Sequence, residues 1–181
     1  MDELLSLFNW NVRGLNDAAK WAAVCEVISR MKPSIVCIQE SKLALCSDAM
    51  RCEIAGPAFD AHVALDAAGT RGGVLLFWKT DRFLVDNVTV RVFSITVRLN
   101  PVGGLTPWFL TTVYGPHDDA RKLDFFNELV TIHNSIVGPW LVIGDFNLIK
   151  DAQDKKTPMC LGVGCGVLGK LLTPLISMKL T

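Results

Sequence analysis

Two polar side chains follow an apolar run near residue 145. The segment VIGDFNLI (142–149) passes from apolar residues into Asp145 and Asn147, which stand one residue apart. In an extended chain, residues i and i+2 point to the same side of the backbone. A carboxylate and an amide at such a place either cap a turn locally or form the rim of a site for a charged substrate. The segment by itself is compatible with both interpretations.

Other apolar runs in the chain end in a polar side chain as well, at Asn11, Glu40 and Tyr114. In open α/β sheets, ligands bind where the carboxyl ends of the strands meet. Glu40, Asp145 and Asn11 suit a hard cation such as Mg²⁺, which takes few protein oxygens besides water and substrate phosphate. Asn147 and Tyr114 are neutral donors suited to phosphate oxygens that gain charge in a transition state. Each residue alone is more simply a turn, capping or core residue, but their recurrence at four strand ends favours a phosphate-handling metal site.

The elements that must position these residues begin with an amphipathic helix. Apolar residues recur at three- and four-residue spacing from Ala18 to Met31, and Asn16 or Asp17 can cap the helix. Apolar runs at 4–12 and 34–40 flank this helix and predict two strands. A strand, helix, strand unit of this kind usually implies parallel neighbouring strands.

The middle of the chain is rich in β-branched and aromatic residues. The alternation from Val88 to Leu99 predicts one half-buried strand, preceded by a tight turn near Asp86–Asn87. Asp118 or Asp119 can cap a second long helix that runs to about Val137, followed by a buried strand in WLVIGDFN (140–147). The apolar face predicted for that helix comprises Leu123, Phe126, Leu129, Val130 and His133.

Length and composition limit the classes of protein. The 181 residues suit one good-sized domain, and half of them are hydrophobic. Eighteen basic and eighteen acidic residues give zero net charge, which argues against nucleic-acid binding by bulk electrostatics. The N-terminus has no basic region of a secretory signal, so we expect an intracellular protein whose six cysteines are free thiols.

The composition shifts after Lys156. We interpret residues 1–156 as one domain and residues 157–181 as a divergent, glycine-rich hydrophobic tail. Lys170 and Pro174 interrupt the tail, which makes it a poor membrane span, so no membrane partner is expected.

Four ordered motifs resemble those of the endonuclease/exonuclease/phosphatase superfamily: WNVRGL (10–15), IQES (38–41), VYGP (113–116) and IGDFN (143–147). The resemblance extends over roughly residues 6 to 155 and is strongest to the apurinic-type endonuclease domains of plant LINE-type retrotransposons. It implies an α/β fold, a four-layer sandwich of two face-to-face mixed β-sheets flanked by helices, incomplete at the C-terminus.

The resemblance also implies an activity, Mg²⁺-dependent hydrolysis of phosphodiester bonds in DNA, with Mn²⁺ as the alternative metal and the nucleus as the place of action. It makes Glu40 the main metal ligand, with Asn11 in its hydrogen-bond network. Tyr114 touches the scissile phosphate, Asp145 orients or deprotonates the attacking water, and Asn147 steadies the phosphoryl oxygens.

One motif of that superfamily is missing from these 181 residues. The family pattern ends in Ser-Asp-His, whereas no such triplet occurs here and no histidine follows His133. Loss of a general acid–base group commonly costs ~10²–10⁴ in rate. We therefore expect a truncated copy with impaired or lost hydrolysis. The alternatives are a non-catalytic remnant or binding module, and a phosphatase of the same superfamily; the oligomeric state has no signature in the sequence.

Overall fold

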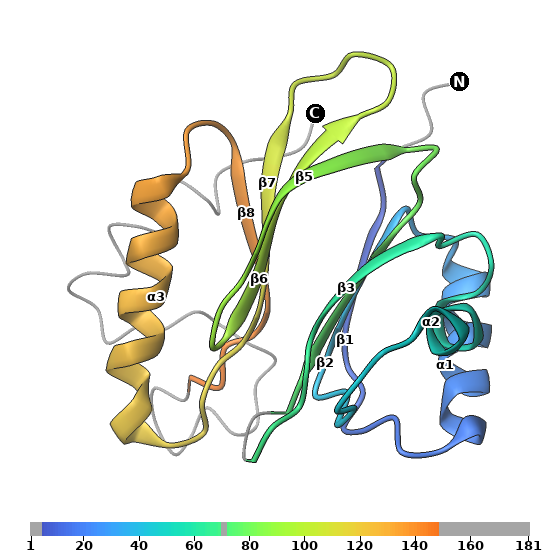
Figure 1. The fold of residues 1–181 in the computed structure, drawn as a ribbon, viewed down its shortest axis with the longest axis horizontal. Helices are drawn as coiled ribbons and strands as arrows, with labels where there is room; N and C mark the ends of the chain where they lie inside the picture. The colour runs from blue at the N-terminus through green and yellow to red at the C-terminus, as the bar shows by residue number, and fades with distance from the viewer. Residues whose placement is uncertain (1–4, 70–71, 149–181) are drawn as a thin grey trace.

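The computed structural model describes residues 5–69 and 72–148, which form two four-stranded sheets that face each other (Figure 1). The first sheet has the order β1-β2-β4-β3, and the second has the order β5-β6-β7-β8. The strands of the first sheet are β1 (Leu7–Asn11), β2 (Ile35–Gln39), β3 (Ala61–Leu65) and β4 (Val74–Trp78). Those of the second are β5 (Phe83–Val90), β6 (Ser94–Pro101), β7 (Trp108–Tyr114) and β8 (Trp140–Asp145).

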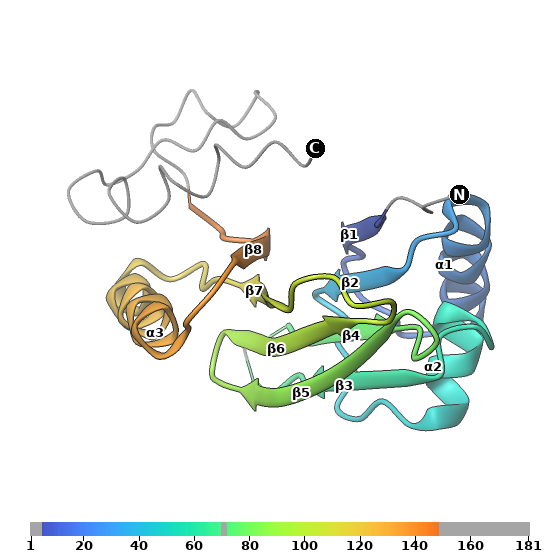
Figure 2. The same ribbon diagram turned by 90° about the horizontal axis from the view of Figure 1, so that it is seen from above.

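Helices cover the outer faces of both sheets, as the two perpendicular views show (Figures 1 and 2). The first sheet is covered by α1 (Ala18–Met31) and α2 (Asp48–Ala55). The second is covered by α3 (Lys122–Ser135), which follows a short 3₁₀-helix, η1 (Asp119–Arg121). The predicted four-layer α/β sandwich is thereby confirmed. The predicted tail at 157–181 lies outside the described residues.

Three hydrophobic clusters fill the three interfaces between these four layers. Side chains of β2 point alternately to opposite faces, so Ile35 and Cys37 pack between the sheets. Val36 and Ile38 pack on the other face, against α1 and α2. Because both faces of β2 are buried, the strand is a continuous apolar run rather than an alternating one. The third cluster joins the second sheet to α3 through Phe93, Val113, Phe125, Leu129 and Phe146.

The helix α1 has the predicted bounds, and its ends are explained by capping. Asp17 accepts a 2.9 Å hydrogen bond from the backbone N–H of Lys20, which satisfies a free donor of the first turn. Lys32 adopts a left-handed conformation and donates to the carbonyl of Ile28 at 2.9 Å, which closes the helix. The predicted parallel pairing of β1 with β2 is confirmed.

The turn predicted near Asp86–Asn87 is wrong. The chain passes straight through this place as β5, and it reverses between Val90 and Ser94 instead. Asn87 has a positive φ of 50°, and the pairing register with β6 shifts between Asp86 and Thr89. Asparagine tolerates this conformation better than most residues, so it accommodates a β-bulge here rather than a hairpin turn.

The apolar face predicted for the helix after Asp118 is also partly wrong. The buried side chains of α3 are Phe125, Leu129 and Ile132, whereas Leu123 is 67% exposed. The spacing of four and three residues is the spacing of one helix face, and this face packs on the second sheet. The helix proper begins later than expected, because Asp118 caps η1 and not α3.

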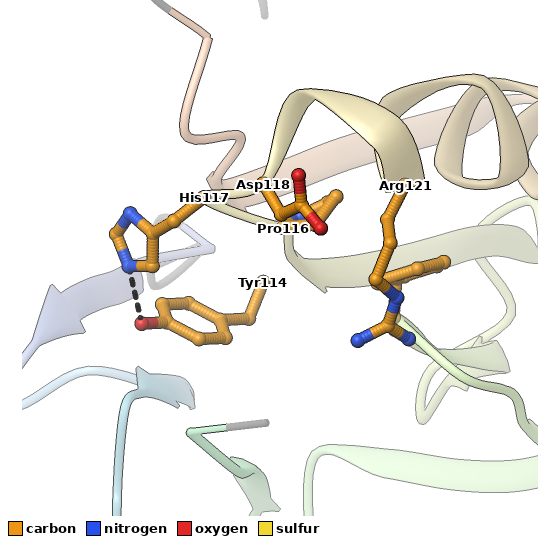
Figure 3. A pocket seen from close by; sticks show the side chains of 7 residues that line it. Tyr114, Pro116, His117, Asp118 and Arg121 are labelled. Carbon is orange, nitrogen blue, oxygen red and sulfur yellow. Dashed lines mark hydrogen bonds between the residues drawn. The ribbon is translucent and has the colours of Figure 1, made fainter. Parts of the chain in front are cut away.

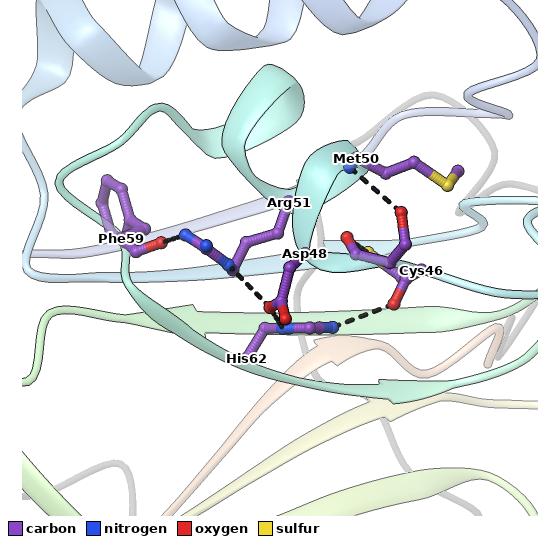
Figure 4. Close-up of polar contacts among 7 residues, drawn as sticks. Cys46, Asp48, Met50, Arg51, Phe59 and His62 are labelled. Carbon is purple, nitrogen blue, oxygen red and sulfur yellow. Dashed lines mark hydrogen bonds and ion pairs between the residues drawn. The ribbon is translucent and has the colours of Figure 1, made fainter.

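The helix α2, which has eight residues, was not predicted from the sequence. Ser47 caps it by accepting a hydrogen bond from the N–H of the third helical residue. Figure 4 shows how the helix is tied to its surroundings: Arg51 and His62 both approach the carboxylate of Asp48, at 3.4 and 3.7 Å, and His62 also bonds to the carbonyl of Cys46. These contacts hold α2 against β3, which carries His62.

The four cysteines of the described segments, Cys25, Cys37, Cys46 and Cys52, are free thiols, as predicted. Within those segments no helix is both long enough and apolar enough to span a membrane.

Candidate active site

The predicted site residues all lie at the carboxyl ends of strands. Asn11 and Asp145 are the last residues of β1 and β8, and Tyr114 is the last residue of β7. Glu40 directly follows β2, and Asn147 lies two residues beyond β8. Each sheet contributes one parallel pair, β1 with β2 and β7 with β8, and β8 contacts both strands of the first pair. The fold therefore brings all five residues to one edge where the two sheets meet.

A direct hydrogen bond joins the two sheets at this edge. The Nδ2 of Asn11 donates to Oδ2 of Asp145 over 2.7 Å. The Oδ1 of Asn11 accepts from the backbone N–H of Arg13 at 3.0 Å, which fixes the orientation of the amide. Asn11 thus holds one oxygen of the Asp145 carboxylate in a defined place.

Asp145 and Asn147 interact with each other as well as with the site. The backbone N–H of Asn147 donates to Oδ1 of Asp145 at 3.0 Å, which is the local capping contact of a turn. The Nδ2 of Asn147 donates to the carbonyl of Gly115 at 2.6 Å. The interpretation as a local turn is confirmed. This turn also places the carboxylate and the amide at the edge of the sheets, and a role of this edge in binding a charged substrate stays a prediction.

Tyr114 is 5% exposed and lies near the carboxylates of Glu40 and Asp145. Burial raises the pKa of its phenol to about 12, and the charges of Glu40 and Asp145 add to this shift. The phenol oxygen lies 3.0 Å from Nε2 of His117. Figure 3 marks this hydrogen bond with a dashed line. Tyr114 is therefore protonated at neutral pH and able to donate a hydrogen bond.

The backbone around Glu40 is held in an uncommon conformation. Glu40 has a positive φ of 57°, and Lys42 has one of 59°. The carbonyl of Glu40 accepts from the N–H of Gly14 at 2.7 Å. Non-glycine residues adopt such angles only where the surroundings fix them, and they occur often at functional sites. The side chain of Glu40 is 20% exposed, and its Oε1 lies 3.2 Å from Nζ of Lys42.

Gly72 is required by the close approach of two site residues. A Cβ atom at this position would lie 2.7 Å from Cε1 of Tyr114 and 3.1 Å from Cγ of Glu40. Its carbonyl accepts from the N–H of Lys42 at 2.7 Å. The glycine therefore allows the segment before β4 to pass directly against Tyr114 and Glu40.

A cavity of about 290 Å³ adjoins Tyr114. The guanidinium of Arg121 lies over the ring of Phe93, with its carbon 4.9 Å from the ring centre. Glu128 of α3 fixes the segment that carries Phe93, because its carboxylate accepts from the N–H groups of Val92 and Phe93. The cavity is lined by Phe93, Tyr114, Gly115, Pro116, His117, Asp118 and Arg121. It thus combines an aromatic wall with a cation and an imidazole.

Three residues of the site were not predicted from the sequence: His117, Arg121 and Gly72. His117 and Arg121 follow the VYGP motif and lie outside any strand, so the argument from strand ends could not include them. Gly72 matters only through the approach of Tyr114 and Glu40, which are distant in sequence.

A family model matches this chain over most of its length. The model describes the Endonuclease/Exonuclease/phosphatase family and matches residues 8–170. The chain belongs to the endonuclease/exonuclease/phosphatase family. This family comprises hydrolases of the nuclease and phosphatase type, and the motif resemblance found in the sequence is confirmed at that level. The closer resemblance to retrotransposon endonucleases stays a prediction.

Solved structures of the endonuclease/exonuclease/phosphatase fold superpose on this chain. A humanized D. rerio TDP2 is 17% identical, with a TM-score of 0.56 over 83% of this chain and 65% of that one. The human Nocturnin catalytic domain, with bound sulfate, is 16% identical, with a TM-score of 0.54 over 80% and 64%. ANGEL2, described as a 2′,3′-cyclic phosphatase, is 13% identical, with a TM-score of 0.61 over 83% and 55%. The chain therefore spans less than two thirds of the length of these proteins, and the likeness concerns the fold.

Enzymes of the endonuclease/exonuclease/phosphatase family typically use divalent metal ions. Across residues 5–69 and 72–148, no three His, Cys, Asp or Glu side chains gather as a metal cluster. Mg²⁺ needs only one or two carboxylates, because it keeps several waters and binds substrate phosphate. Glu40 fits this requirement, since its Oε1 already faces the positive charge of Lys42 at 3.2 Å, and Asn11 can add an amide oxygen.

Proposed function

We propose that this chain hydrolyses phosphodiester bonds in DNA and that it uses Mg²⁺, with Mn²⁺ as the alternative metal. The contact between Asn11 and Asp145 carries the proposal. Asp145 accepts one hydrogen bond at each oxygen, from Asn11 and from the N–H of Asn147. A carboxylate oxygen has two lone pairs, so each can still accept a hydrogen from a water molecule. The carboxylate is thus fixed in orientation and still able to hold and deprotonate water.

The other residues have matching roles in this proposal. Tyr114 donates its hydroxyl hydrogen to a phosphate oxygen, because a phenol with a pKa of about 12 stays protonated. Glu40, assisted by the amide oxygen of Asn11, would hold the metal. A bound divalent ion supplies positive charge that stabilises the phosphoryl oxygens as their charge grows. Asn147 helps to steady those oxygens, although its amide is also bonded to Gly115.

The cavity beside Tyr114 supports a nucleic-acid substrate. Arginine binds phosphate in a planar, two-point geometry, and its guanidinium plane can also stack on a base. Arg121 has no ion pair with any acidic side chain of the described segments, and its guanidinium lies on the ring of Phe93. A strand whose scissile phosphate lies at Tyr114 could therefore place a neighbouring nucleotide in this cavity.

The type of nuclease within the family is proposed from the four sequence motifs. Their order and form favour a retrotransposon-type endonuclease, for which the nucleus is the place of action. We further propose that a polypeptide of these 181 residues turns over slowly, because it contains no Ser-Asp-His triplet. An absent general acid–base group lowers the rate by roughly 10²–10⁴.

A second candidate is hydrolysis of a small phosphate ester. The cavity of about 290 Å³ can hold one sugar phosphate or nucleotide. One structural neighbour, ANGEL2, is described as a 2′,3′-cyclic phosphatase. Phosphatase activity is therefore the alternative proposal for this chain.

The substrate class can be tested with the purified chain. Supercoiled plasmid DNA and p-nitrophenyl phosphate are each incubated with Mg²⁺, with and without EDTA. Slow nicking of the plasmid that EDTA abolishes is the expected result, with little release of p-nitrophenol. Hydrolysis of the monoester alone would favour the phosphatase, and no turnover of either substrate would favour a non-catalytic role.

Binding of DNA through the cavity is tested with Arg121→Ala. Removing one phosphate contact should lower the slope of log affinity against log salt by about 1, for double-stranded DNA. Arg30→Ala is the matched control, because Arg30 lies on α1 and pairs with Glu26 at the surface. Equal slopes of log affinity against log salt for the two variants would show that Arg121 does not contact DNA phosphate.

A further inference from the structure

Gln39 is a buried polar residue that has no role in the proposed mechanism. It is the last residue of β2 and directly precedes Glu40. Its side chain is fully buried. Alternate residues of a strand point to the same side, so Gln39 shares the face between the sheets with Ile35 and Cys37. The motif resemblance gives a role to Glu40 in this stretch and none to Gln39.

The side-chain amide of Gln39 joins three strands. Its Nε2 donates to Oδ1 of Asn9 on β1 at 2.7 Å and to Oγ1 of Thr112 on β7 at 3.1 Å. An amide nitrogen carries two hydrogens, so both are used. Thr112 is fully buried, as Gln39 is. Because β7 belongs to the second sheet, the bond to Thr112 ties the two sheets together.

The two strands that this bond joins across the sheets each lead into a site residue. Glu40 follows Gln39, and Tyr114 lies two residues after Thr112. Glu40 and Tyr114 both lie against Gly72, where a Cβ atom would be 3.1 Å from Cγ of the one and 2.7 Å from Cε1 of the other. The bond between Gln39 and Thr112 therefore lies one step back along both strands from this pair.

The backbone makes the position of Glu40 depend on that of Gln39. Gln39 pairs with both neighbouring strands, opposite Asn11 on β1 and Val74 on β4. The regular strand ends there, because Glu40 has a positive φ of 57°. The alternation of side chains stops at such a residue. Gln39 is therefore the last regular position from which the direction of Glu40 is set.

The other atom of the amide gives no stability in return. Oε1 of Gln39 is buried and has no hydrogen-bond partner among the described residues. A buried acceptor without a partner lowers the stability of a folded chain. An apolar residue would avoid this cost on a face that Ile35 and Cys37 already make apolar. The amide is therefore explained by what its nitrogen holds in place.

We propose that Gln39 is a positioning residue for hydrolysis, whose amide fixes the separation between Glu40 and Tyr114. By holding β2 against β7, it keeps the proposed metal ligand at a constant distance from the proposed phosphate contact. A second hydrogen bond between the sheets, from β1 to β8, acts on the neighbouring strands. This inference rests on the proposed function.

Two neighbouring threonines of β7 separate positioning from general stability. Thr112 bonds to Gln39. Thr111 points to the opposite face, where its hydroxyl bonds to the hydroxyl of Thr96 and to Nε1 of Trp140. Both threonines are fully buried. Thr111→Val and Thr112→Val are matched variants, because each replaces a hydroxyl by a methyl group and should lower the melting temperature by leaving buried partners unpaired.

Mg²⁺ affinity, measured by isothermal titration calorimetry, is the first readout. Gln39→Met and Thr112→Val should each weaken Mg²⁺ binding by about 3- to 10-fold, the scale of one hydrogen bond between uncharged groups. Thr112→Ser should bind Mg²⁺ as the wild type does, because it keeps the hydroxyl. Thr111→Val should also keep the wild-type affinity, despite its lower melting temperature. In a chain that binds Mg²⁺, unchanged affinity in Gln39→Met would overturn the inference.

The double variant Gln39→Met/Thr112→Val separates the two roles most sharply. Replacing both partners by apolar groups leaves no unpaired group behind, so the melting temperature should return towards that of the wild type. Mg²⁺ affinity should stay weakened, because β2 is still not tied to β7. A purely structural Gln39 predicts the reverse, with affinity following stability. Recovery of Mg²⁺ affinity in the double variant, or its loss in Thr111→Val, would therefore refute positioning.

A spectroscopic readout needs neither metal nor turnover. Tyr114 is the single tyrosine of the chain, so ¹³C labelling at tyrosine Cζ gives one resonance. This resonance should shift in Gln39→Met and in the double variant, and stay unchanged in Thr111→Val. An unshifted resonance in Gln39→Met would overturn the inference. A wild-type chain that neither binds Mg²⁺ nor nicks DNA, but shows these shifts, would overturn the proposed function and leave the positioning of Tyr114 by Gln39 supported.

Discussion

Asn11 and Asp145 are 134 positions apart in the sequence, and their side chains are joined by a 2.7 Å hydrogen bond. Each residue ends a strand of a different sheet. The contact therefore links the relative position of the two sheets to the orientation of the carboxylate proposed to hold water. Glu40 follows the neighbour of β1, and Tyr114 ends the neighbour of β8, so the remaining site residues flank this contact.

Replacing Asn11 should impair hydrolysis without unfolding the chain. Asn11→Ala removes a hydrogen bond to an ionised group, which is worth about 1.5–3 kcal/mol, so kcat should fall roughly 10- to 100-fold. Single-turnover nicking of plasmid DNA measures the effect, and circular dichroism checks the fold. Asn16→Ala is a control, because Asn16 is an exposed asparagine in the loop that follows β1. An unchanged rate in Asn11→Ala would show that Asp145 needs no support from Asn11.

Lys42 should compete with a metal ion for Glu40. The ammonium of Lys42 lies 3.2 Å from Oε1 of Glu40, and its side chain is 44% exposed. Lys42→Met should therefore tighten Mg²⁺ binding modestly, by about 2- to 5-fold, as expected for a solvent-screened ion pair. Isothermal titration calorimetry with Mg²⁺ measures this, with Lys20→Met on α1 as the control for net charge. Weaker binding in Lys42→Met would mean that the lysine orders Glu40 for the metal.

The phenol of Tyr114 should lose its proton at a higher pH in the folded chain than in the unfolded chain. Its pKa is raised from 10.0 to about 12 by burial and by the nearby carboxylates. Between pH 10 and pH 12 the folded chain then holds a proton that the unfolded chain has lost, so the free energy of unfolding falls as pH rises through this range. Absorbance of tyrosinate at 295 nm reports this residue alone, because the chain has one tyrosine. Titration at pH 10 in a chain that circular dichroism shows to be folded would contradict the buried position.

The sequence predicted those features that depend on local pattern. Residues 18–31 form a helix with the predicted bounds because the apolar spacing and the Asp17 cap agree. The β5–β6 connection was misplaced, because Asn87 is as suitable for a bulge as for a turn and only pairing with β6 decides between them. The helix α2 was missed because eight residues give a weak periodic signal.

In the candidate site too, the sequence predicted only the residues that a local pattern marks. The sequence indicated five site residues because each lies at the end of a predicted strand or just after it, and the topology brings strand ends together: Asn11, Glu40, Tyr114, Asp145 and Asn147. The structure places them at one edge of the two sheets, with Asp145 bonded to both Asn11 and Asn147, while their chemical roles stay predictions. His117 and Arg121 belong to the loop after β7, and their importance comes from what the folded chain places beside them: Tyr114 for one, Phe93 for the other.

The most direct test of the account is metal-dependent nicking by three isosteric variants. Glu40→Gln and Asp145→Asn each remove one negative charge and keep the shape of the side chain. Glu26→Gln is the matched control, because Glu26 is an exposed residue of α1. Supercoiled plasmid is incubated with Mg²⁺ and each variant, purified in parallel with the wild-type chain, and every sample is repeated with EDTA.

The account predicts slow, EDTA-sensitive nicking by the wild-type chain and by Glu26→Gln, and a loss of at least about 10²-fold in Glu40→Gln and Asp145→Asn, the scale of removing a general base or metal ligand. Equal rates in all four chains would contradict it, because the two carboxylates would then take no part in the chemistry.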